Sequence, residues 1–154
     1  METGATFKCI VLDAWAILAW LQGEPAGEIV KNILEWAEGN GEAGIKIKTL
    51  LPGLNAPPRI LLNLINLGEV FYILGRKKGE KEARKVINNL RSGPVELVEA
   101  SESIIFAAAT LKMKYAISYA DAFAAATAKM KKGALLTGDP ELKRFREVSV
   151  IWLE

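Results

Sequence analysis

Short runs of apolar, β-prone residues alternate along the chain with longer stretches of helical periodicity. Five runs predict strands: CIVLD at 9–13, RILLN at 59–63, PVELVEA at 94–100, ALLTGD at 134–139 and VSVIWL at 148–153. The stretches between them predict helices at 14–22, 25–39, 64–78, 80–91, 101–114 and 119–132. Strands that alternate with helices predict an α/β fold with a mostly parallel sheet of four to five strands, covered on both faces.

Residues at the ends of these stretches support several of the predicted boundaries. Pro25 suits a first helical turn, Ser101 is placed to cap a helix, and Gly133 follows a lysine-rich helix end. Pro140 predicts the start of a short last helix. The segment 39–58 is rich in glycine and proline and predicts an extended loop, functional or mobile, with a small strand at 45–51.

Length and composition favour one folded domain over residues 1–154, since the chain is 51% hydrophobic and 25% charged. Its single cysteine, Cys9, excludes an internal disulfide; packing is its expected role and a reducing compartment the expected location. The start METGATFK lacks the pattern of a signal peptide, and no run approaches about 18 apolar residues. We therefore expect a cytoplasmic protein without a membrane segment.

The chain contains no histidine, which limits the chemistry that it can perform. Ser-His-Asp and Cys-His catalysis are excluded, and a single cysteine also excludes ordinary zinc sites. Any reaction must use carboxylates, hydroxyls, lysines or a bound hard metal ion.

Two aspartates follow predicted strands. Asp13 ends the first apolar run, and Asp139 ends the strand ALLTGD after Thr137 and Gly138. In an open α/β sheet, ligands bind beyond the carboxyl ends of the strands, so these acids share one rim if their strands are near neighbours. Each acid alone is also an ordinary strand-end residue.

Two further acids lie on predicted helices. Asp121 falls in the first turn of the helix that Ser118 and Tyr119 open, where the helix dipole favours an anion; it is otherwise a simple helix-start acid. Glu69 lies mid-helix among leucine, valine and aromatic residues, where burial of a carboxylate requires a partner or a metal. Alternatively, Glu69 emerges on a polar stripe.

The combination of the four acids predicts a metal site. Gathered together, Asp13, Glu69, Asp121 and Asp139 would repel one another unless a multivalent cation neutralised them. Oxygen ligands select Mg²⁺ or Mn²⁺, which suits phosphodiester hydrolysis because a metal activates water and stabilises the leaving oxygen.

The passages that carry these acids resemble those of PIN-domain nucleases, especially the VapC-like toxins. They are VLDAWAILAWL, NLINLGEVFYIL, ISYADAFAAATAKMKKGALLTGDPEL and the terminal strand. Their order and spacing agree with the family across nearly the whole chain. The part from SYADAFAAATA to LLTGDPEL is the most specific, because an acid at a helix start and another at the next strand end have the family's separation.

This resemblance implies a PIN-like α/β/α sandwich and a divalent-metal-dependent endoribonuclease that cleaves RNA. It implies that Asp13, Glu69, Asp121 and Asp139 are catalytic residues and hold Mg²⁺ or Mn²⁺. It also implies a homodimer, a cognate antitoxin partner and the role of the toxin in a toxin-antitoxin pair. Two features depart from the family: Trp15 replaces a small polar residue two positions after Asp13, and the 39–58 segment is longer than usual.

Several residues near the acids have candidate supporting roles. Thr137 is a candidate to hydrogen-bond a site carboxylate or water, and Ser118 to touch the site through its helix cap. Asn66, one turn before Glu69, either faces the cleft or lies on the helix surface. Trp15 is either a platform on which an RNA base stacks or, as we favour, a packing residue.

Glu141 follows Asp139 closely, and we expect it to be a solvated helix-start acid.

The distribution of charged and apolar residues suggests surfaces that could bind a partner. The formal net charge is +2, and without the four candidate ligands it would be +6. RKKGEKEARK, KMKK and KRFR offer cations to a phosphate backbone, although interleaved acids suit an ordinary solvated face equally well. The helices 64–78 and 101–114 carry more apolar residues than one buried stripe needs, which suggests a dimer contact.

Two other functions compete with ribonuclease activity. One is a PIN fold that binds RNA or protein with weakened catalysis, suggested by Trp15. The other is a different acid-rich α/β protein, a phosphatase or receiver domain. It fits poorly, because AWA after Asp13 lacks the second aspartate of the phosphatase motif and the chain lacks the acidic pair and lysine pattern of a receiver.

Overall fold

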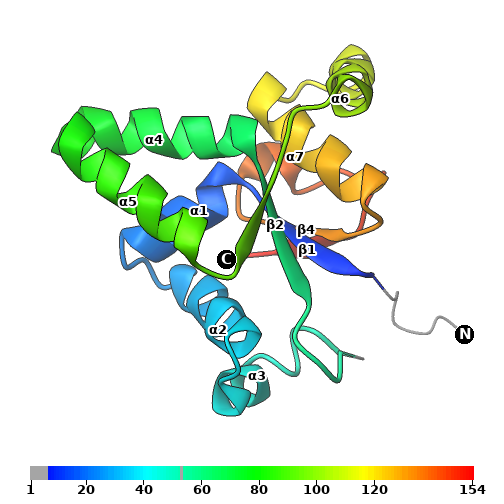
Figure 1. Cartoon of the computed structure of the whole chain (residues 1–154). Coiled ribbons are helices and arrows are strands. Elements are labelled where there is room, and N and C mark those ends of the chain that lie inside the picture. Colours follow the sequence, from blue (N-terminus) through cyan, green and yellow to red (C-terminus); the bar gives the residue numbers. More distant parts are fainter. Residues whose placement is uncertain (1–6, 53) are drawn as a thin grey trace, which may run out of the picture.

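Five parallel strands form the centre of the structure, a computed structural model that describes residues 7–52 and 54–154 (Figure 1). They are hydrogen-bonded in the order β3-β2-β1-β4-β5, and every neighbouring pair is parallel. The strands are β1 (Cys9–Leu12), β2 (Arg59–Asn63), β3 (Val95–Val98), β4 (Ala134–Thr137) and β5 (Val150–Trp152). All five predicted strands are confirmed, and the sheet is parallel throughout.

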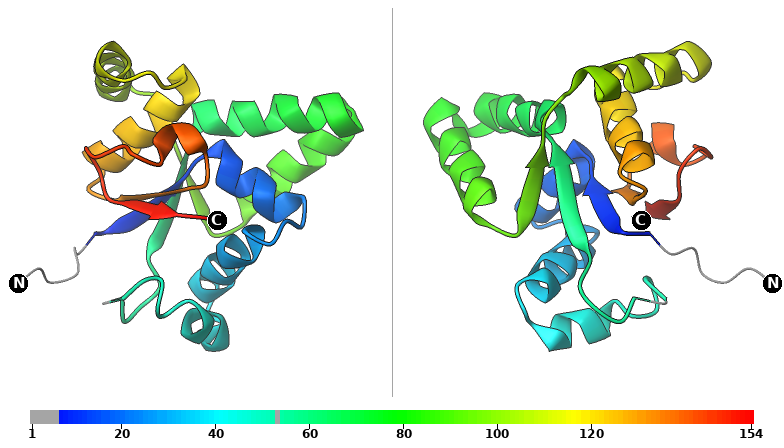
Figure 2. Two further views of the ribbon diagram at one scale, coloured as in Figure 1. Left: turned by 180° about the vertical axis from the view of Figure 1, so that it is seen from behind. Right: turned by 45° about the vertical axis from the view of Figure 1, so that its right-hand side comes forward.

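Helices cover both faces of this sheet (Figure 2), which confirms the predicted α/β/α architecture. One core cluster joins one face of the sheet to α1, α2, α4 and α5, and the other joins the opposite face to α6 and α7. The helices are α1 (Ala14–Leu21), α2 (Gly27–Ala37), α3 (Gly41–Lys46), α4 (Leu64–Lys78), α5 (Glu80–Ser92), α6 (Glu102–Lys114), α7 (Tyr119–Met130) and the 3-10 helix η1 (Pro140–Leu142).

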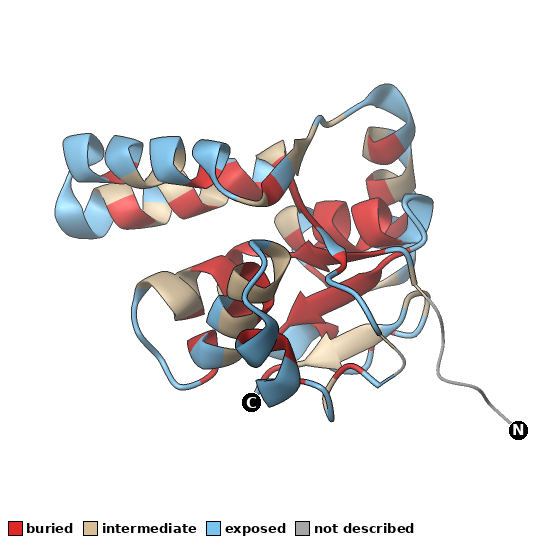
Figure 3. Cartoon of the chain, turned by 60° about the horizontal axis from the view of Figure 1, so that its bottom comes forward, coloured by how far each residue is buried: buried red, intermediate tan, exposed pale blue. Residues whose placement is uncertain are grey.

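The two-residue period of β1 divides its side chains between these two cores. Ile10 and Leu12 belong to the α1 side, whereas Cys9 and Val11 belong to the α7 side. All four side chains are buried, as are those of β4 and most of β2, whereas the edge strand β5 is only partly buried (Figure 3). Burial on both faces explains why the strands read as continuous apolar runs.

Cys9 has the predicted packing role. Its thiol is buried against the turn after α7, where a Cβ on Gly133 would lie 2.5 Å from the Cys9 sulfur. Only glycine therefore fits at position 133 without displacing β1.

Most predicted helix boundaries are confirmed, and one is shifted. The Ile104 N–H donates to the Ser101 hydroxyl (3.3 Å), and Pro140 begins η1. Pro25, however, precedes α2 rather than lying in its first turn; its carbonyl accepts a hydrogen bond from the Glu28 N–H (3.1 Å). The helix begins at Gly27, which packs against the α1 backbone so closely that a Cβ would overlap the Ala19 carbonyl.

The small strand predicted at 45–51 is wrong, because the segment is helical and turn-like. Asn40 caps α3 by accepting hydrogen bonds from the N–H groups of Glu42 and Ala43 (3.1 and 3.3 Å). Ile47 and Leu51 are buried four residues apart, a spacing that suits a helical turn better than a strand.

Residues 1–6, which include most of the METGATFK start, lie outside the described residues, as does Gly53 of the 39–58 segment. Among the residues that are described, no helix is both long enough and apolar enough to cross a bilayer.

The sheet order creates a crevice beside β1. The chain runs from β1 to β2 and β3 on one side, then crosses to β4 and β5 on the other. The carboxyl ends of β1 and β4 are neighbours, since Leu12 pairs with Leu136. Ligands bind at such switch points in open α/β sheets.

Candidate functional site

Asp13 lies at the centre of this rim and is held from two sides. Leu12 pairs with Leu62 on β2 and Leu136 on β4, so Asp13 follows the central strand between its two neighbours. As the N-cap of α1, it accepts a hydrogen bond from the Ala16 N–H (2.8 Å), and its other oxygen accepts the Thr137 hydroxyl. The residue is only 1% exposed, so these donors replace the water that the carboxylate has lost.

The same threonine fixes Asp139. The Thr137 hydroxyl oxygen accepts a hydrogen bond from the Asp139 N–H (3.0 Å), so one side chain connects both aspartates. Asp139 in turn accepts from the Glu141 N–H (3.0 Å) and thereby starts η1. Asp13 and Asp139 therefore lie at the same rim of the sheet, as predicted.

Asp121 enters the rim from α7. Its N–H donates to the Ser118 hydroxyl (3.0 Å), which confirms that Ser118 caps the helix. The Asp121 side chain belongs to a residue 5% exposed, and its Oδ2 has no hydrogen-bond partner among the described residues. A buried carboxylate oxygen without a donor is costly, which indicates that it serves an absent ligand.

Glu69 and Asn66 approach from α4. Asn66 is fully buried and donates to the Ala120 carbonyl (3.0 Å), which ties α4 to the start of α7, while its Oδ1 finds no partner within the described part of the chain. Glu69 is half-buried; burial and the charge of Asp139 raise its pKa, and Asn66 lowers it. Asn66 thus lies inside the structure beside the site, not on the helix surface.

Burial is the main cause of the raised pKa values of these acids, and their mutual charges add to it. Burial raises the pKa of Asp13 to about 7, against the hydrogen bonds from Thr137 and Ala16, and the charges of Asp139 and Glu69 raise it further. Burial also raises the pKa of Asp121 to about 9, with added contributions from Glu141, Asp139 and Asp13. Asp13 and Asp139 therefore interact electrostatically with each other and with both Asp121 and Glu69.

Glu141 is exposed at the start of η1, as expected, but it also lies close to two other acids. Its carboxylate lies with those of Asp121 and Asp139, and one oxygen from each of the three falls within 4.8 Å of the others. Asp13 and Glu69 lie outside this tight trio. The sequence analysis did not place Glu141 with Asp121, because their proximity depends on η1 lying at the start of α7, where Glu141 Oε1 accepts from the Ser118 N–H. The available signal was the position of Glu141 two residues after Asp139.

Asn63 is a second residue that the sequence analysis overlooked. It is the last residue of β2, the strand beside β1, is fully buried, and caps α4 by accepting the Ile65 N–H (2.8 Å). Its amide donates to the Thr127 hydroxyl (3.0 Å) on α7. Asn63 therefore orients both helices that carry site acids, and its position at a strand end was the signal that would have revealed it.

Trp15 packs on the turn that carries Asp139. Its ring lies so close to Gly138 that a Cβ there would overlap the ring, with Cζ3 only 2.5 Å away. Trp15 is half-buried against the core on the α1 side. This contact supports the packing role over a stacking platform and makes Trp15 a support for the Thr137–Asp139 turn.

The arrangement is chemically suited to a hard divalent cation. Its donors are carboxylate oxygens, they are crowded enough to repel one another, and a buried Asp121 oxygen lacks a partner. Asp121, Asp139 and Glu141 offer the closest oxygens, with Asp13 and Glu69 beside them.

Comparisons with known proteins agree with this description. A family model described as the PIN domain matches residues 10–148. Comparison with curated protein sequences finds no match. Several solved structures are similar to the chain. Among them are DNA-bound VapBC from Salmonella typhimurium (13% identity, TM-score 0.62, covering 92% of this chain and 96% of that one) and VapBC-1 from nontypeable Haemophilus influenzae (17% identity, TM-score 0.63, 92% and 96%). Another is VapC20 from Mycobacterium tuberculosis, described as a sarcin-ricin loop cleaving toxin (20% identity, TM-score 0.56, 91% and 98%). At these identities the likeness shows the fold.

The raised pKa values predict a pH-dependent stability of the metal-free protein. The unfolded chain releases the two protons near pH 4, whereas folded Asp13 and Asp121 keep theirs until about 7 and about 9. Their contribution is therefore fully present below pH 4 and is lost as pH rises through these values. In EDTA, Asp121→Asn should match wild type in Tm at pH 4 and exceed it at pH 8.5 by about 2–5 °C.

Differential scanning calorimetry at both pH values measures this difference. The matched control is Glu102→Gln, which changes an exposed acid at the start of α6. Its Tm should equal that of wild type at both pH values. A wild-type advantage over Asp121→Asn at pH 8.5 would contradict the electrostatic account.

The Trp15 contact predicts a rescue. Gly138→Ala should destabilise the fold by about 1–3 kcal/mol, because the added Cβ would overlap the Trp15 ring. Gly138 does not have a positive φ, so the cost comes from this overlap and not from backbone strain. In a Trp15→Ser background the same change should cost much less, because the ring is absent. Urea unfolding of the four proteins gives the coupling energy.

Gly41→Ala serves as the control, since a Cβ there meets no atom within 4 Å. Equal costs of Gly138→Ala in both backgrounds would show that Trp15 does not restrict position 138.

Proposed function

Because the chain belongs to the PIN-domain family, whose members are nucleases, we propose that it is a divalent-metal-dependent endoribonuclease. The observation that carries this proposal is the crowding of carboxylates at the sheet's switch point. Asp121, Asp139 and Glu141 present oxygens within 4.8 Å of one another, beside the buried Asp13.

Asp13, Glu69, Asp121 and Asp139 are our proposed metal-binding and catalytic residues, and Mg²⁺ or Mn²⁺ is the proposed ion. When bound, such an ion supplies an activated water and stabilisation of the leaving oxygen. The chain's contribution is to hold the carboxylates in place: Thr137 orients Asp13 and Asp139, and Ser118 orients the start of α7.

RNA is the proposed substrate, supported by cations next to the acids. Lys143, Arg144 and Arg146 follow η1 directly and are exposed. A basic segment beside a metal site suits a phosphate backbone, which is attracted through its charge whatever its sequence. We also propose that the protein acts in the cytoplasm, where its RNA substrates would be found.

A binding module with weakened catalysis is the second candidate. Trp15 takes the position of a small polar residue and packs on Gly138, so it supplies no hydroxyl or amide to the site. Such a protein would still bind RNA through its basic segment, or a protein partner.

Substitution of single acids separates these two functions. Asp13→Asn, Asp121→Asn and Asp139→Asn should each reduce cleavage of an RNA substrate by about a hundredfold or more, because each removes a charge that holds the metal. Cleavage by wild type should require Mg²⁺ or Mn²⁺ and stop in EDTA. Gel analysis of structured and unstructured RNAs measures both effects.

Glu102→Gln is again the control and should retain full activity. Metal-independent cleavage, or undiminished cleavage by all three variants, would locate the reaction elsewhere. Retained RNA binding with no metal-dependent cleavage would favour the binding module.

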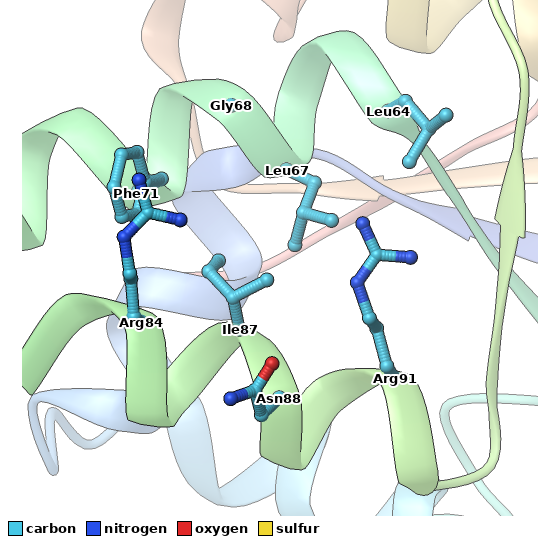
Figure 4. A pocket seen from close by; sticks show the side chains of 8 residues that line it. All are labelled: Leu64, Leu67, Gly68, Phe71, Arg84, Ile87, Asn88 and Arg91. Carbon is cyan, nitrogen blue, oxygen red and sulfur yellow. The ribbon is translucent and has the colours of Figure 1, made fainter.

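We further propose that the protein is the toxin of a toxin-antitoxin pair, as the VapBC complexes among similar structures suggest. A groove between α4 and α5 is a suitable seat for an antitoxin segment (Figure 4). Leu64, Leu67 and Phe71 line it from α4, and Arg84 and Arg91 extend from α5. An apolar segment with acidic side chains complements this lining.

Gly68 offers a test of the groove that leaves the chain's own packing intact. A side chain at this position would enter the groove, and a Cβ there meets no atom within 4 Å. Gly68→Trp should therefore weaken co-purification with the protein encoded by the adjacent open reading frame by about tenfold or more, with little change in Tm.

Gly41→Trp, at an equally open position on α3, provides the control. Undiminished co-purification of the Gly68→Trp protein would place the antitoxin on another surface.

We also propose that the protein forms a homodimer through the exposed apolar residues of α6. Phe106 is 65% exposed and Met113 is 84% exposed, and their seven-residue spacing puts them on one helix face. A second copy of the chain would cover this face.

A further inference from the structure

We propose that Trp152 and Lys143 form a subsite for one unpaired nucleotide of the RNA substrate, whose base stacks on the indole ring while a phosphate pairs with the lysine. This inference rests on the proposed ribonuclease function and names residues that recognise the substrate. Its basis is the contact between the two side chains, in which Lys143 Nζ lies over the Trp152 ring, 5.3 Å from its centre.

The register of the sheet places Trp152 beside the acidic site. Trp152 is the last residue of β5 and pairs with Thr137, the last residue of β4. The Leu153 N–H donates to the Thr137 carbonyl (2.8 Å), so the two strands end at the same level. Asp139 follows Thr137 by two residues, and neighbouring strands lie about 4.8 Å apart. Trp152 therefore lies at the same rim as Asp139, one strand further out.

The Trp152 side chain lies on the face of the sheet that carries α7. Leu136 and Ile151 pair with each other, and both pack into the core on the α1 side. Because side chains alternate between the two faces of a strand, Trp152 points to the opposite side. Leu142 of η1 belongs to the core on that side, and Lys143 follows it directly. The segment after η1 thus brings Lys143 over the ring.

Packing in the cores does not account for Trp152. The other three tryptophans, Trp15, Trp20 and Trp36, pack against the core on the α1 side. Trp152 belongs to neither apolar core of the described residues and is only partly buried. A large aromatic side chain kept near the surface beside a functional site suits a platform on which a base stacks. Trp152 therefore has the position for which Trp15 was considered from the sequence.

Lys143 is an exposed cation that is available to an anion. None of the ion pairs in the described part of the chain involves this lysine. A cation held over an aromatic ring offers its charge to a phosphate, while the ring offers a face to a base. The pair fits unpaired RNA, because bases in a duplex are stacked on one another and do not expose the face that the ring requires.

RNA binding without metal tests the subsite without cleavage. A fluorescein-labelled oligoadenylate of about 12 nucleotides is titrated with the full chain in EDTA, and fluorescence anisotropy gives the Kd. Trp152→Leu should weaken binding about tenfold or more, because it removes the stacking surface. Trp152→Phe keeps a ring and should stay within about threefold of wild type. Both variants keep the charge and should leave the salt dependence unchanged.

Lys143→Ala tests the phosphate contact separately. It should weaken binding about threefold or more at low salt and reduce the slope of log Kd against log salt concentration by about 1. Lys31→Ala is the matched control, since Lys31 is an exposed cation of α2, which packs on the opposite face of the sheet. Its affinity and salt dependence should equal those of wild type.

Tryptophan fluorescence reports the stacking itself. Oligoadenylate should quench the emission of wild type, and Trp152→Phe should lose most of this quenching although it still binds. A paired RNA of the same length should bind wild type more weakly and quench it less. The Trp152→Phe and Lys143→Ala measurements decide the question even if Trp152→Leu does not fold.

The outcomes distinguish failure of the subsite from failure of the proposed function. Undiminished binding by a folded Trp152→Leu protein, or equal quenching of wild type and Trp152→Phe, would overturn the stacking role while wild type still cleaves RNA with Mn²⁺. Unchanged affinity and salt slope for Lys143→Ala would overturn the phosphate contact. A wild-type protein that neither binds the oligoadenylate nor cleaves RNA with Mn²⁺ would overturn the ribonuclease function itself.

Discussion

The hydrogen bond from the Thr137 hydroxyl to the buried Asp13 carboxylate is the interaction on which the acidic site depends. Thr137 accepts in turn from the Asp139 N–H, Asp139 accepts from the Glu141 N–H, and Glu141 accepts from the Ser118 N–H. Ser118 then accepts from the Asp121 N–H, so a continuous series of hydrogen bonds connects Asp13 to Asp121. Segments more than a hundred residues apart in the chain are brought into register by this series, which spans β1, β4, η1 and α7.

Such order has an electrostatic cost. The donors in the series are almost all backbone N–H groups, and they orient the carboxylates without neutralising them. Asp13 and Asp121 consequently have a pKa far above the ordinary value, with burial as the main cause and neighbouring acids as a further one. Crowded, buried acids lower the stability of the metal-free fold at neutral pH, and the proposed divalent cation would offset this cost.

The sequence predicted the components of the site better than their connections. Asp13, Asp139 and Asp121 were identifiable because strand ends and helix starts have clear local patterns, and a parallel sheet brings such ends to one rim. The trio with Glu141 was not predictable, since it requires η1 to pack against α7. The predicted strand at 45–51 failed for a related reason: the cap at Asn40 and the burial of Ile47 outweighed the β propensity of the segment.

Glu69 differs from the other acids because it stands outside the hydrogen-bonded series. Glu69 lies on α4, and two hydrogen bonds connect the start of this helix to α7. The Asn63 amide donates to the Thr127 hydroxyl, and the Asn66 amide donates to the Ala120 carbonyl. The neighbouring Gly68 lines the groove between α4 and α5 (Figure 4). One turn of α4 therefore carries a site acid and part of the proposed antitoxin seat, so a partner in the groove contacts the helix that positions Glu69. The acids in the Thr137 series are tied to one another by hydrogen bonds, whereas the position of Glu69 depends on α4, the helix that also lines the groove.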